Sequence, residues 1–186
     1  MSDLVVRAAR LDDLEQIVAL RVALLREYHD HPLYTDLRAD APDRARELYA
    51  AQLVAPDETI FLAERARHVI GILRCVDAVG SPLLLPERYC YISSVYVLPA
   101  ERRRGVLRAL LAAAERWCAH RGLGEMRLHN AATARAAATV WSAFGFEVVE
   151  EVRRRVLPVD HALPRQQPAL QRNSGRFRGS PREPEP

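Results

Sequence analysis

A short basic turn between two regular segments has the clearest chemistry in the chain. Residues 91–97 are rich in aromatic and β-branched side chains, which predicts a buried strand that Pro99 ends. Three arginines and Gly105 follow as a turn, and apolar residues then recur at helical spacing from Val106. The first N–H groups of a helix lack internal partners and lie at the positive end of its dipole, and glycine lets the backbone approach a ligand. The order of strand, turn and helix therefore predicts an anion-binding cradle suited to a pyrophosphate.

The composition predicts one domain without a disulfide framework. The chain has 186 residues, of which 49% are hydrophobic, and it can bury one substantial core. The cysteines Cys75, Cys90 and Cys118 form no CxxC pair, which argues against disulfides or a metal site and fits a reducing, cytoplasmic location. The acidic start of the chain is unlike a signal peptide. No apolar run approaches the roughly 20 residues that a membrane span needs, so we expect no membrane partner.

The charged residues do not predict a nucleic-acid partner. All 27 basic residues are arginine, but 24 acidic residues are interleaved with them and the net charge is only +3. Because arginine and alanine are abundant throughout the chain, we attribute the use of arginine in place of lysine to the base composition of the genome. The block at residues 153–155 and the arginines beyond it leave open an interaction role for the C-terminal tail. We favour a solvated strand edge and an unstructured end for these segments.

The first third of the chain predicts one strand and one amphipathic helix. Residues 4–8 have strand composition, and Asp12 with Glu15 three residues later forms a capping-box-like helix start. The residues that follow have helical spacing, and their inner face is apolar except for Arg21. This face consists of Leu14, Ile17, Val18, Arg21, Leu24, Leu25 and Tyr28.

A second helix and a hairpin follow in the sequence. Residues 42–54 begin with a proline that is favoured in the first turn of a helix. Residues 59–63 and 69–76 predict two strands joined by a polar connection. Glycine and prolines predict a loop over residues 79–88.

The second half alternates helices and strands. We expect the helix from Val106 to end near Gly122, residues 126–129 to form a short strand, and Thr133 to cap a further helix. The inner face of that helix would consist of Ala134, Ala137, Ala138, Trp141 and Phe144. Residues 146–157 are predicted to be extended because they contain several valines.

These elements predict a mixed α/β fold with one twisted sheet flanked by helices. We place the domain at residues 1–157. The remaining residues, 158–186, contain many prolines and arginines and few apolar side chains, which predicts a disordered tail.

The order of elements and two motifs resemble the GNAT superfamily of acyl-CoA-dependent N-acyltransferases, over roughly residues 4–157. The family's acyl-CoA signature is Val-x-Pro-x-x-Arg-x-x-Gly-x-Gly/Ala. Its first four defined positions are matched by Val97, Pro99, Arg102 and Gly105, whereas Leu107 stands where Gly or Ala is usual.

A second match to this family lies downstream. The pattern Asn-x-x-Ala-x-x-x-Tyr-x-x-x-Gly-Phe is matched by Ala137, Gly145 and Phe146. Ala134 replaces its Asn and Trp141 replaces its Tyr, which serves as the usual general acid in the family. The combination of both motifs in the right order is far more specific than either alone.

The resemblance implies acetyl-CoA as co-substrate. The pantetheine arm would lie between the central strand and residues 126–129, and would pair with backbone groups of Val95 and Val97 like an added strand. An N–H near Val97 would stabilise the oxyanion of the tetrahedral intermediate. Backbone N–H groups of residues 103–108 would hold the pyrophosphate, so the expected cofactor-binding residues are Val95, Val97, Arg102, Arg103, Arg104, Gly105, Val106, Leu107, Arg108 and Trp141.

The catalytic residues are less well defined by this resemblance. In relatives a Glu or His on the central strand is the base, and the corresponding positions here are Tyr91 and Ser93, neither of which is a good base near pH 7. Neighbouring segments offer other candidates, namely Glu64, Asp77, His29 and His31. Trp141 is expected to be a packing wall beside the pantetheine arm.

The resemblance therefore implies an N-acetyltransferase that acts on a primary amine of a small molecule or peptide by direct attack in a ternary complex. The alternative is a protein of the same fold that binds or senses acyl-CoA without turnover. The acceptor would lie against residues 29–37 and 79–89, which include His31, Tyr34, Asp36 and Glu87. Analogy with the family also suggests a homodimer.

Overall fold

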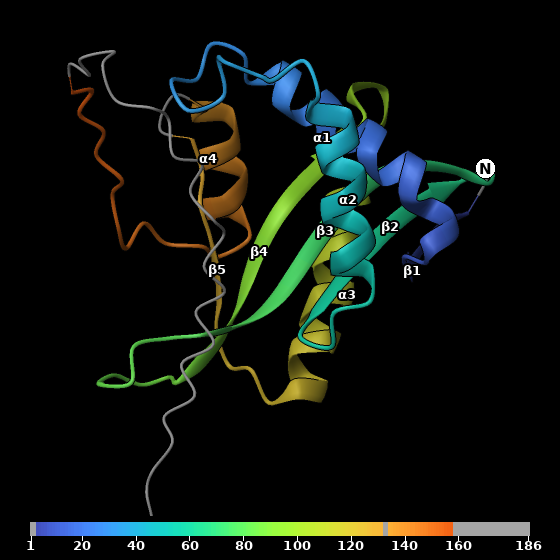
Figure 1. Ribbon diagram of the computed structural model, residues 1–186. Coiled ribbons are helices and arrows are strands. Elements are labelled where there is room, and N and C mark those ends of the chain that lie inside the picture. The colour runs from blue at the N-terminus through green and yellow to red at the C-terminus, as the bar shows by residue number, and fades with distance from the viewer. Residues whose placement is uncertain (1–2, 132–133, 158–186) are drawn as a thin grey trace, which may run out of the picture. The chain divides into compact units, whose positions relative to one another are not determined.

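One mixed sheet organises the part of the chain that the computed structural model describes, residues 3–131 and 134–157. Neighbouring strands follow the chain order β1-β2-β3-β4-β5 (Figure 1). The first four strands pair antiparallel, and β5 pairs parallel to β4. The strands are β1 (Leu4–Ala8), β2 (Glu58–Arg65), β3 (His68–Val79), β4 (Arg88–Val97) and β5 (Met126–Leu128).

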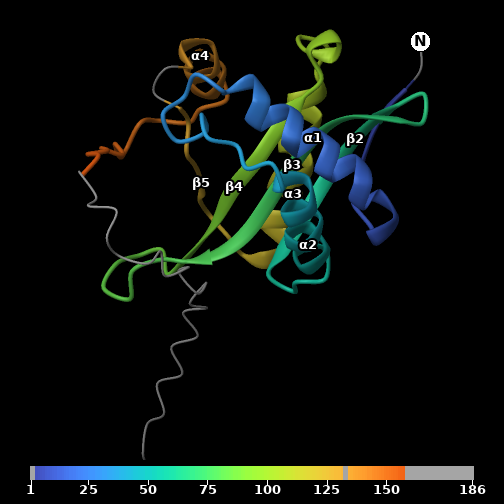
Figure 2. The same cartoon turned by 45° about the horizontal axis from the view of Figure 1, so that its top comes forward.

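Helices cover both faces of this sheet. The helices α1 and α2 lie on one face, and α3 lies on the other (Figures 1 and 2). Short 3₁₀ turns precede α1 at Leu11–Asp13 and follow β4 at Pro99–Glu101. The helices are α1 (Leu14–Glu27), α2 (Ala41–Leu53), α3 (Val106–Arg121) and α4 (Arg135–Ala143). The mixed α/β fold predicted from the sequence is therefore confirmed.

The strands are apolar on both sides because both faces of the sheet are covered. Leu62 and Ile72 are fully buried beneath α1 and α2. Their neighbours Ala63 and Leu73 point the other way and are fully buried against α3. This alternation places separate apolar clusters above and below the sheet.

The cysteines belong to the cluster beneath α3, as expected for core residues. Cys75, Cys90 and Cys118 are free and buried. Contact with Cys75 and burial raise the pKa of the Cys90 thiol, and burial raises the pKa of Cys118 to about 12. These thiols therefore stay protonated near neutral pH and act as small apolar groups.

The helix α3 sits close to the sheet at Gly71. A Cβ at this position would lie 3.1 Å from a Val106 side-chain carbon and 3.3 Å from one of Leu110. It would also lie 3.2 Å from the carbonyl oxygen of Tyr96. A side chain here would therefore be tight, and α3 or β4 would have to move by a few tenths of an ångström to admit it.

The start of the first helix differs from the sequence prediction. Asp12 does not cap it, because a 3₁₀ turn intervenes and Asp13 lies at the boundary instead. The buried Asp13 carboxylate accepts hydrogen bonds at 2.7 Å from both terminal nitrogens of Arg7, and one from the Arg10 main-chain N–H at 2.8 Å. The bonds from Arg7 lower the pKa of Asp13. A contact with β1, more distant in the chain, thus determines where the helix begins.

The prediction of an extended strand at residues 146–157 is wrong for residues 147–157, which form no helix or strand. Their apolar side chains are exposed, with Val148 87% and Val149 83% accessible. The spacing explains this, since valines at 148, 149, 152 and 156 do not alternate with polar residues as a half-buried strand requires. The residues up to 146 form a compact unit, and residues 147–157 lie outside it. The predicted cap Thr133 and the predicted tail fall outside the described residues.

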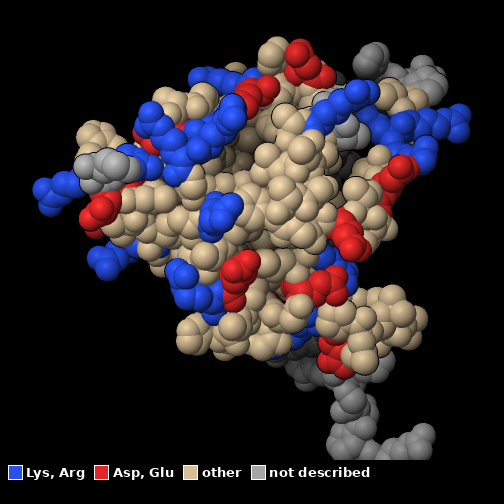
Figure 3. Space-filling view, turned by 180° about the vertical axis from the view of Figure 1, so that it is seen from behind, with Lys and Arg blue, Asp and Glu red and all other residues tan. Residues whose placement is uncertain are grey.

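Charges of both signs occur together on the surface. Figure 3 shows acidic and basic side chains interspersed around an uncharged area on one face. Within the described residues, no helix is long and apolar enough to cross a membrane.

Candidate active site

An irregularity in β4 opens the sheet near its centre. Pairing with β3 shifts register after Ile72, and the extra residue lies in β4, where Ser94 has a φ of +52°. Pairing with β5 ends at Ile92 and Leu128. The two parallel strands therefore separate beyond this point, which we call the β4–β5 fork.

On the fork side, the main chain of β4 pairs with no described strand beyond Ile92, although the Val97 carbonyl accepts a hydrogen bond from the Arg102 side chain. The N–H of Leu98 donates to Ile70 of β3 at 2.9 Å, and the carbonyl of Tyr96 also faces β3, at Gly71. Because adjacent residues of a strand direct their main-chain groups to opposite edges, the groups of Val95 and Val97 face away from β3. Among the described residues no strand covers this edge. An extended ligand chain could add to it as a strand does.

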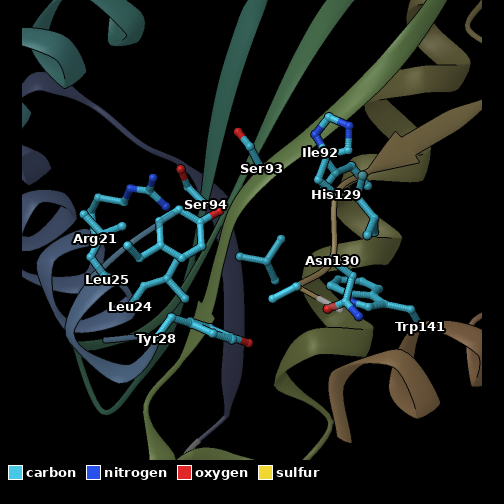
Figure 4. Close-up of a pocket in the computed structure, with 14 residues that line it drawn as sticks. Arg21, Leu24, Leu25, Tyr28, Ile92, Ser93, Ser94, His129, Asn130 and Trp141 are labelled. Atoms are coloured by element: carbon cyan, nitrogen blue, oxygen red, sulfur yellow. The ribbon is translucent and has the colours of Figure 1, made fainter. Parts of the chain in front are cut away.

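A pocket of about 120 Å³ lies at the fork (Figure 4). Side chains of α1 form one wall, and the ends of β4 and β5 with α4 form the other. We call it the fork pocket. Its lining residues are Arg21, Leu24, Leu25, Tyr28, Tyr34, Ile92, Ser93, Ser94, Val95, Leu128, His129, Asn130, Ala131 and Trp141.

An imidazole and a phenol are joined at the edge of the fork pocket. The Tyr91 hydroxyl and His129 Nδ1 lie 2.8 Å apart, and their rings meet edge to face. Burial raises the pKa of the Tyr91 phenol, which therefore stays neutral near pH 7. When the imidazole donates from Nδ1 to Tyr91, its other nitrogen, Nε2, is left as a proton acceptor.

The serines of β4 are held by neighbouring elements. Ser93 accepts a hydrogen bond at 2.9 Å from Arg74, which also pairs with Glu58 at 2.8 Å. Ser94 and Tyr49 of α2 are joined by a hydrogen bond of 2.8 Å between their hydroxyl groups. Both hydroxyls thus fix the irregular part of β4 against β3 and α2. Neither is paired with a base that could activate it as a nucleophile.

The turn of residues 102–105, which we call the arginine turn, joins β4 to α3. Gly105 has a φ of +81° and directly precedes the helix, a conformation that favours glycine. In the described part of the chain, none of the main-chain N–H groups of residues 103–108 donates to a main-chain carbonyl. A row of N–H groups without main-chain partners at the positive end of α3 fits a pyrophosphate.

The arginines of this turn differ in their contacts. Arg102 donates to the Val97 carbonyl at 3.0 Å and pairs with Glu27 at 2.6 Å, so it ties the turn to β4 and α1. Arg104 lies 3.5 Å from Glu101, and Arg103 is exposed with a φ of +61°. Arg103 and Arg104 therefore extend towards solvent, where a phosphate group could reach them.

The remaining expected cofactor residues lie on α3 and α4. Val106 is buried and Leu107 packs against the core cluster, so the Leu107 side chain is directed inward and leaves the row of N–H groups free. Arg108 lines a second hollow between α3 and α4, together with Phe144 and Gly145. Trp141 lines the fork pocket and meets Phe146 edge to face.

Several acidic and basic candidates lie away from the fork pocket. Glu64 is paired with Arg7. Asp77 is buried, and the hydrogen bond from Arg88 lowers its pKa. The exposed His29 lies beside Asp30. Of the other candidates for the base or the acceptor site, only Tyr34 lines the pocket, whereas His31, Asp36 and Glu87 do not.

Among the polar residues of the site that were not assigned a role from the sequence are His129 and Arg21. His129 follows the short strand β5, and its role depends on Tyr91, which is 38 positions away in the chain. Arg21 did leave a signal, because it interrupts the apolar inner face of α1. A polar residue at such a position indicates that the helix borders a cavity there.

Comparison with known proteins agrees with this geometry. The pattern of the acetyltransferase (GNAT) family matches residues 20–146. Aminoglycoside N(6')-acetyltransferase type 1 of Salmonella typhimurium is 36% identical over 62 residues, and the protein of the same name from Salmonella enteritidis matches equally. The aligned segment is 33% of this chain and 43% of each relative, so the match spans less than half the length of these curated relatives.

Solved structures share the fold. The aminoglycoside N-acetyltransferase AAC(6')-Iy in complex with CoA has a TM-score of 0.70 at 24% identity, covering 86% of this chain and 97% of that chain. A predicted acetyltransferase from Clostridium acetobutylicum, solved with acetyl-CoA, has a TM-score of 0.68 at 17% identity, covering 83% and 96%. The family pattern spans more than half of the sequence and lies on this same fold. The chain therefore belongs to the acetyltransferase (GNAT) family.

Proposed function

We propose that this protein is an acetyl-CoA-dependent N-acetyltransferase that acts on a primary amine. The observation that carries the proposal is the edge of β4 that pairs with no described strand beyond Ile92. It runs from the N–H groups at the start of α3, which have no main-chain partner in the described part of the chain, to the fork pocket with His129. One extended ligand could therefore place its pyrophosphate at one end and its thioester at the other.

The arginine turn fits the diphosphate of coenzyme A. A Cβ at Gly105 would meet nothing within 4 Å, so space is open beside the turn. The N–H groups of residues 103–108 would bind the phosphate oxygens, with Arg103, Arg104 and Arg108 around them. Val95 and Val97 would hold the pantetheine amides through their main-chain groups, with Trp141 against the arm.

The acetyl thioester supplies a carbonyl carbon that a neutral amine can attack. We assign His129 Nε2 as the base that removes the amine proton, directly or through one water, with Tyr91 as the group that orients the ring. Attack forms the C–N bond and breaks the C–S bond, and the thiolate leaves with the electron pair. The N–H of Val97 faces the side on which negative charge develops at the carbonyl oxygen. Ser93 then contributes to the shape of the site rather than to proton transfer.

The leaving group does not need a strong acid in this site. Trp141 stands where the family has a Tyr, and an indole N–H does not protonate a thiolate. A thiol of ordinary acidity, with a pKa of about 8.5 by analogy with cysteine, is already a tolerable leaving group. Water can supply the proton after departure.

The alternative is a protein that binds acyl-CoA without turnover. The observation that favours it is Trp141, which fills the acid's position with a packing residue. It predicts binding of acetyl-CoA but no transfer to any amine.

The test is release of the CoA thiol from acetyl-CoA in the presence of amines. The panel contains amino acids, peptides, simple amines and aminoglycosides, the last because the curated relatives and the structural neighbour AAC(6')-Iy are aminoglycoside acetyltransferases by name. Binding of acetyl-CoA by calorimetry is measured in parallel. Amine-dependent thiol release supports the transferase, binding alone supports the alternative, and absence of binding at millimolar acetyl-CoA contradicts both.

We further propose a cytoplasmic location, which reduced, buried cysteines support. Interspersed charges support the absence of a nucleic-acid partner. A domain limit at residue 157 and a homodimer also stay proposals.

A further inference from the structure

The fork pocket has an unusual charge for an amine-binding site. Among the described residues that line it, Arg21 is permanently charged and none is acidic. Figure 4 shows Arg21 on the α1 side, near Ser94, with His129 and Trp141 on the opposite side. A positive site repels a second ammonium group, so a polycationic amine is a poor match for this pocket.

Arg21 also lacks a partner within the described part of the chain. Its guanidinium makes no hydrogen bond or ion pair there, although the nearby Arg74 and Arg102 are paired with Glu58 and Glu27. The side chain is half-buried. Partial burial of an unpaired cation is unfavourable, and the cost is removed when an anion binds it.

The charge of Arg21 acts on Tyr91, one of the proposed catalytic pair Tyr91 and His129. Burial raises the pKa of Tyr91, and the positive charges of Arg74 and Arg21 oppose that rise. Tyr91 in turn contacts His129. Arg21 and His129 line the same pocket from opposite sides, so one small molecule in it could contact Arg21 while its amine lies at His129.

We propose that Arg21 binds a carboxylate of the acceptor, so that the acceptor is an amine that also carries an acidic group, as an amino acid does. This inference rests on the proposed transferase function and narrows its substrate class. A guanidinium matches a carboxylate through two parallel N–H bonds, which fixes the orientation of the molecule as well as its charge. Neamine and other aminoglycosides lack such a group and carry several ammonium groups instead.

The first experiment compares matched acceptors. L-phenylalanine and phenethylamine form one pair, L-tyrosine and tyramine a second, and neamine represents polycations. Binding is measured by thermal shift in the presence of CoA, and turnover by thiol release from acetyl-CoA. We expect the carboxylate to improve kcat/KM by about 10- to 100-fold in at least one pair, as charged hydrogen bonds do.

The second experiment changes the guanidinium. Arg21→Gln should raise KM for the preferred amino acid by about 10- to 100-fold and leave its decarboxylated partner unchanged. Arg21→Lys keeps the charge but loses the forked geometry and should recover part of the affinity. Arg26→Gln, an exposed position on the same helix outside the pocket, is the matched control and should behave as wild type.

The outcomes separate this inference from the proposed function. Amino acids that bind in the presence of CoA and lose binding in Arg21→Gln support the inference, even if no acetyl transfer occurs. If amines are acetylated with no preference for a carboxylate, or if neamine is preferred and Arg21→Gln has no effect, the inference fails while the transferase function stands. The inference also fails if no acidic amine binds or reacts.

Discussion

The arginine turn and the fork pocket lie along the same strand, yet they are built from different parts of the chain. The turn offers main-chain N–H groups that follow one another in sequence, from residue 103 to residue 108. The fork pocket is made of side chains from α1, β4, the end of β5 and α4. One site is thus local and the other is assembled by the fold.

Because the two sites are built differently, they should be sensitive to different kinds of mutation. A row of N–H groups tolerates most side-chain changes, provided that the backbone keeps its conformation and no bulk or negative charge enters. A pocket of side chains depends on each residue separately. Variants of the arginine turn should therefore lose binding of coenzyme A, and variants of the fork pocket should lose turnover.

The largest expected effect comes from the imidazole of the fork pocket. His129→Gln should lower kcat by about 10²- to 10⁴-fold, because it removes the proposed base, while acetyl-CoA binding stays unchanged. Thiol release from acetyl-CoA measures kcat, and titration calorimetry measures acetyl-CoA binding.

His120→Gln, an exposed position on α3, is the control for that experiment. Tyr91→Phe should have a smaller effect, because it removes the orienting hydrogen bond at 2.8 Å but leaves the base. A kcat that is unchanged in His129→Gln would place the base elsewhere and would remove the proposed division between the two sites.

The next effect concerns the arginine turn. Gly105→Glu should weaken acetyl-CoA binding by about 100-fold, because it adds negative charge and a side chain at a φ of +81°. Gly105→Ala tests conformation alone and should weaken binding less. Titration calorimetry measures both, with circular dichroism to show that the fold is kept.

Gly124→Glu is the matched control for charge, since this glycine has no positive φ and also has nothing near its Cβ. Affinity equal to wild type in Gly105→Glu would show that the ligand is not held by this turn. Loss of affinity in the Gly124 variant as well would show a general effect of added negative charge.

The contrast also explains what could be predicted from the sequence. The turn was found because Pro99, Gly105 and the apolar spacing after Val106 are local features, and the helix α3 begins and ends where they indicate. The sheet was predicted for the same reason, since alternating or continuous apolar runs define its strands. The predicted strands were too short, because the pairing across β2 and β3 extends into polar residues that have no β pattern of their own.

The fork pocket could not be predicted in the same way. Nothing in the sequence around Ser94 indicates the irregularity there, or the hydrogen bond that joins Ser94 to Tyr49 of α2. Tyr91 was identified by position, but its partner His129 directly follows β5, which lies beside β4 only in the folded chain. Residues 147–157 show the opposite error, in which a strand is predicted from composition where none forms. Valines favour a strand only where their spacing allows one face to be buried.

A smaller effect should follow when α3 is displaced from the sheet. Gly71→Ala places a methyl group 3.1–3.3 Å from Val106, Leu110 and the Tyr96 carbonyl, so we expect a loss of about 1–3 kcal/mol in the free energy of unfolding. Because α3 carries the arginine turn, acetyl-CoA affinity should fall while Arg21 and His129 keep their roles. Urea unfolding measures the first and calorimetry the second. Stability equal to wild type would mean that α3 can move away without cost.

The smallest effect should come from Asp77, which joins β3 to β4 through Arg88 and to α3 through Arg121, and which lies outside both sites. The hydrogen bond from Arg88 lowers the pKa of Asp77, so its ionised form stabilises the native state above the unfolded pKa of about 3.9. This stability is lost as pH falls through the lower native pKa. Asp77→Asn should cost about 1–2 kcal/mol at pH 7, less than a fully buried pair because the Arg88 side chain is 50% exposed. Urea unfolding should show the two proteins converging below pH 4, whereas a constant difference down to pH 2 would mean that the charge of Asp77 contributes nothing. In the same variant kcat and acetyl-CoA affinity should be unchanged, because a general loss of stability does not by itself act on either the turn or the pocket.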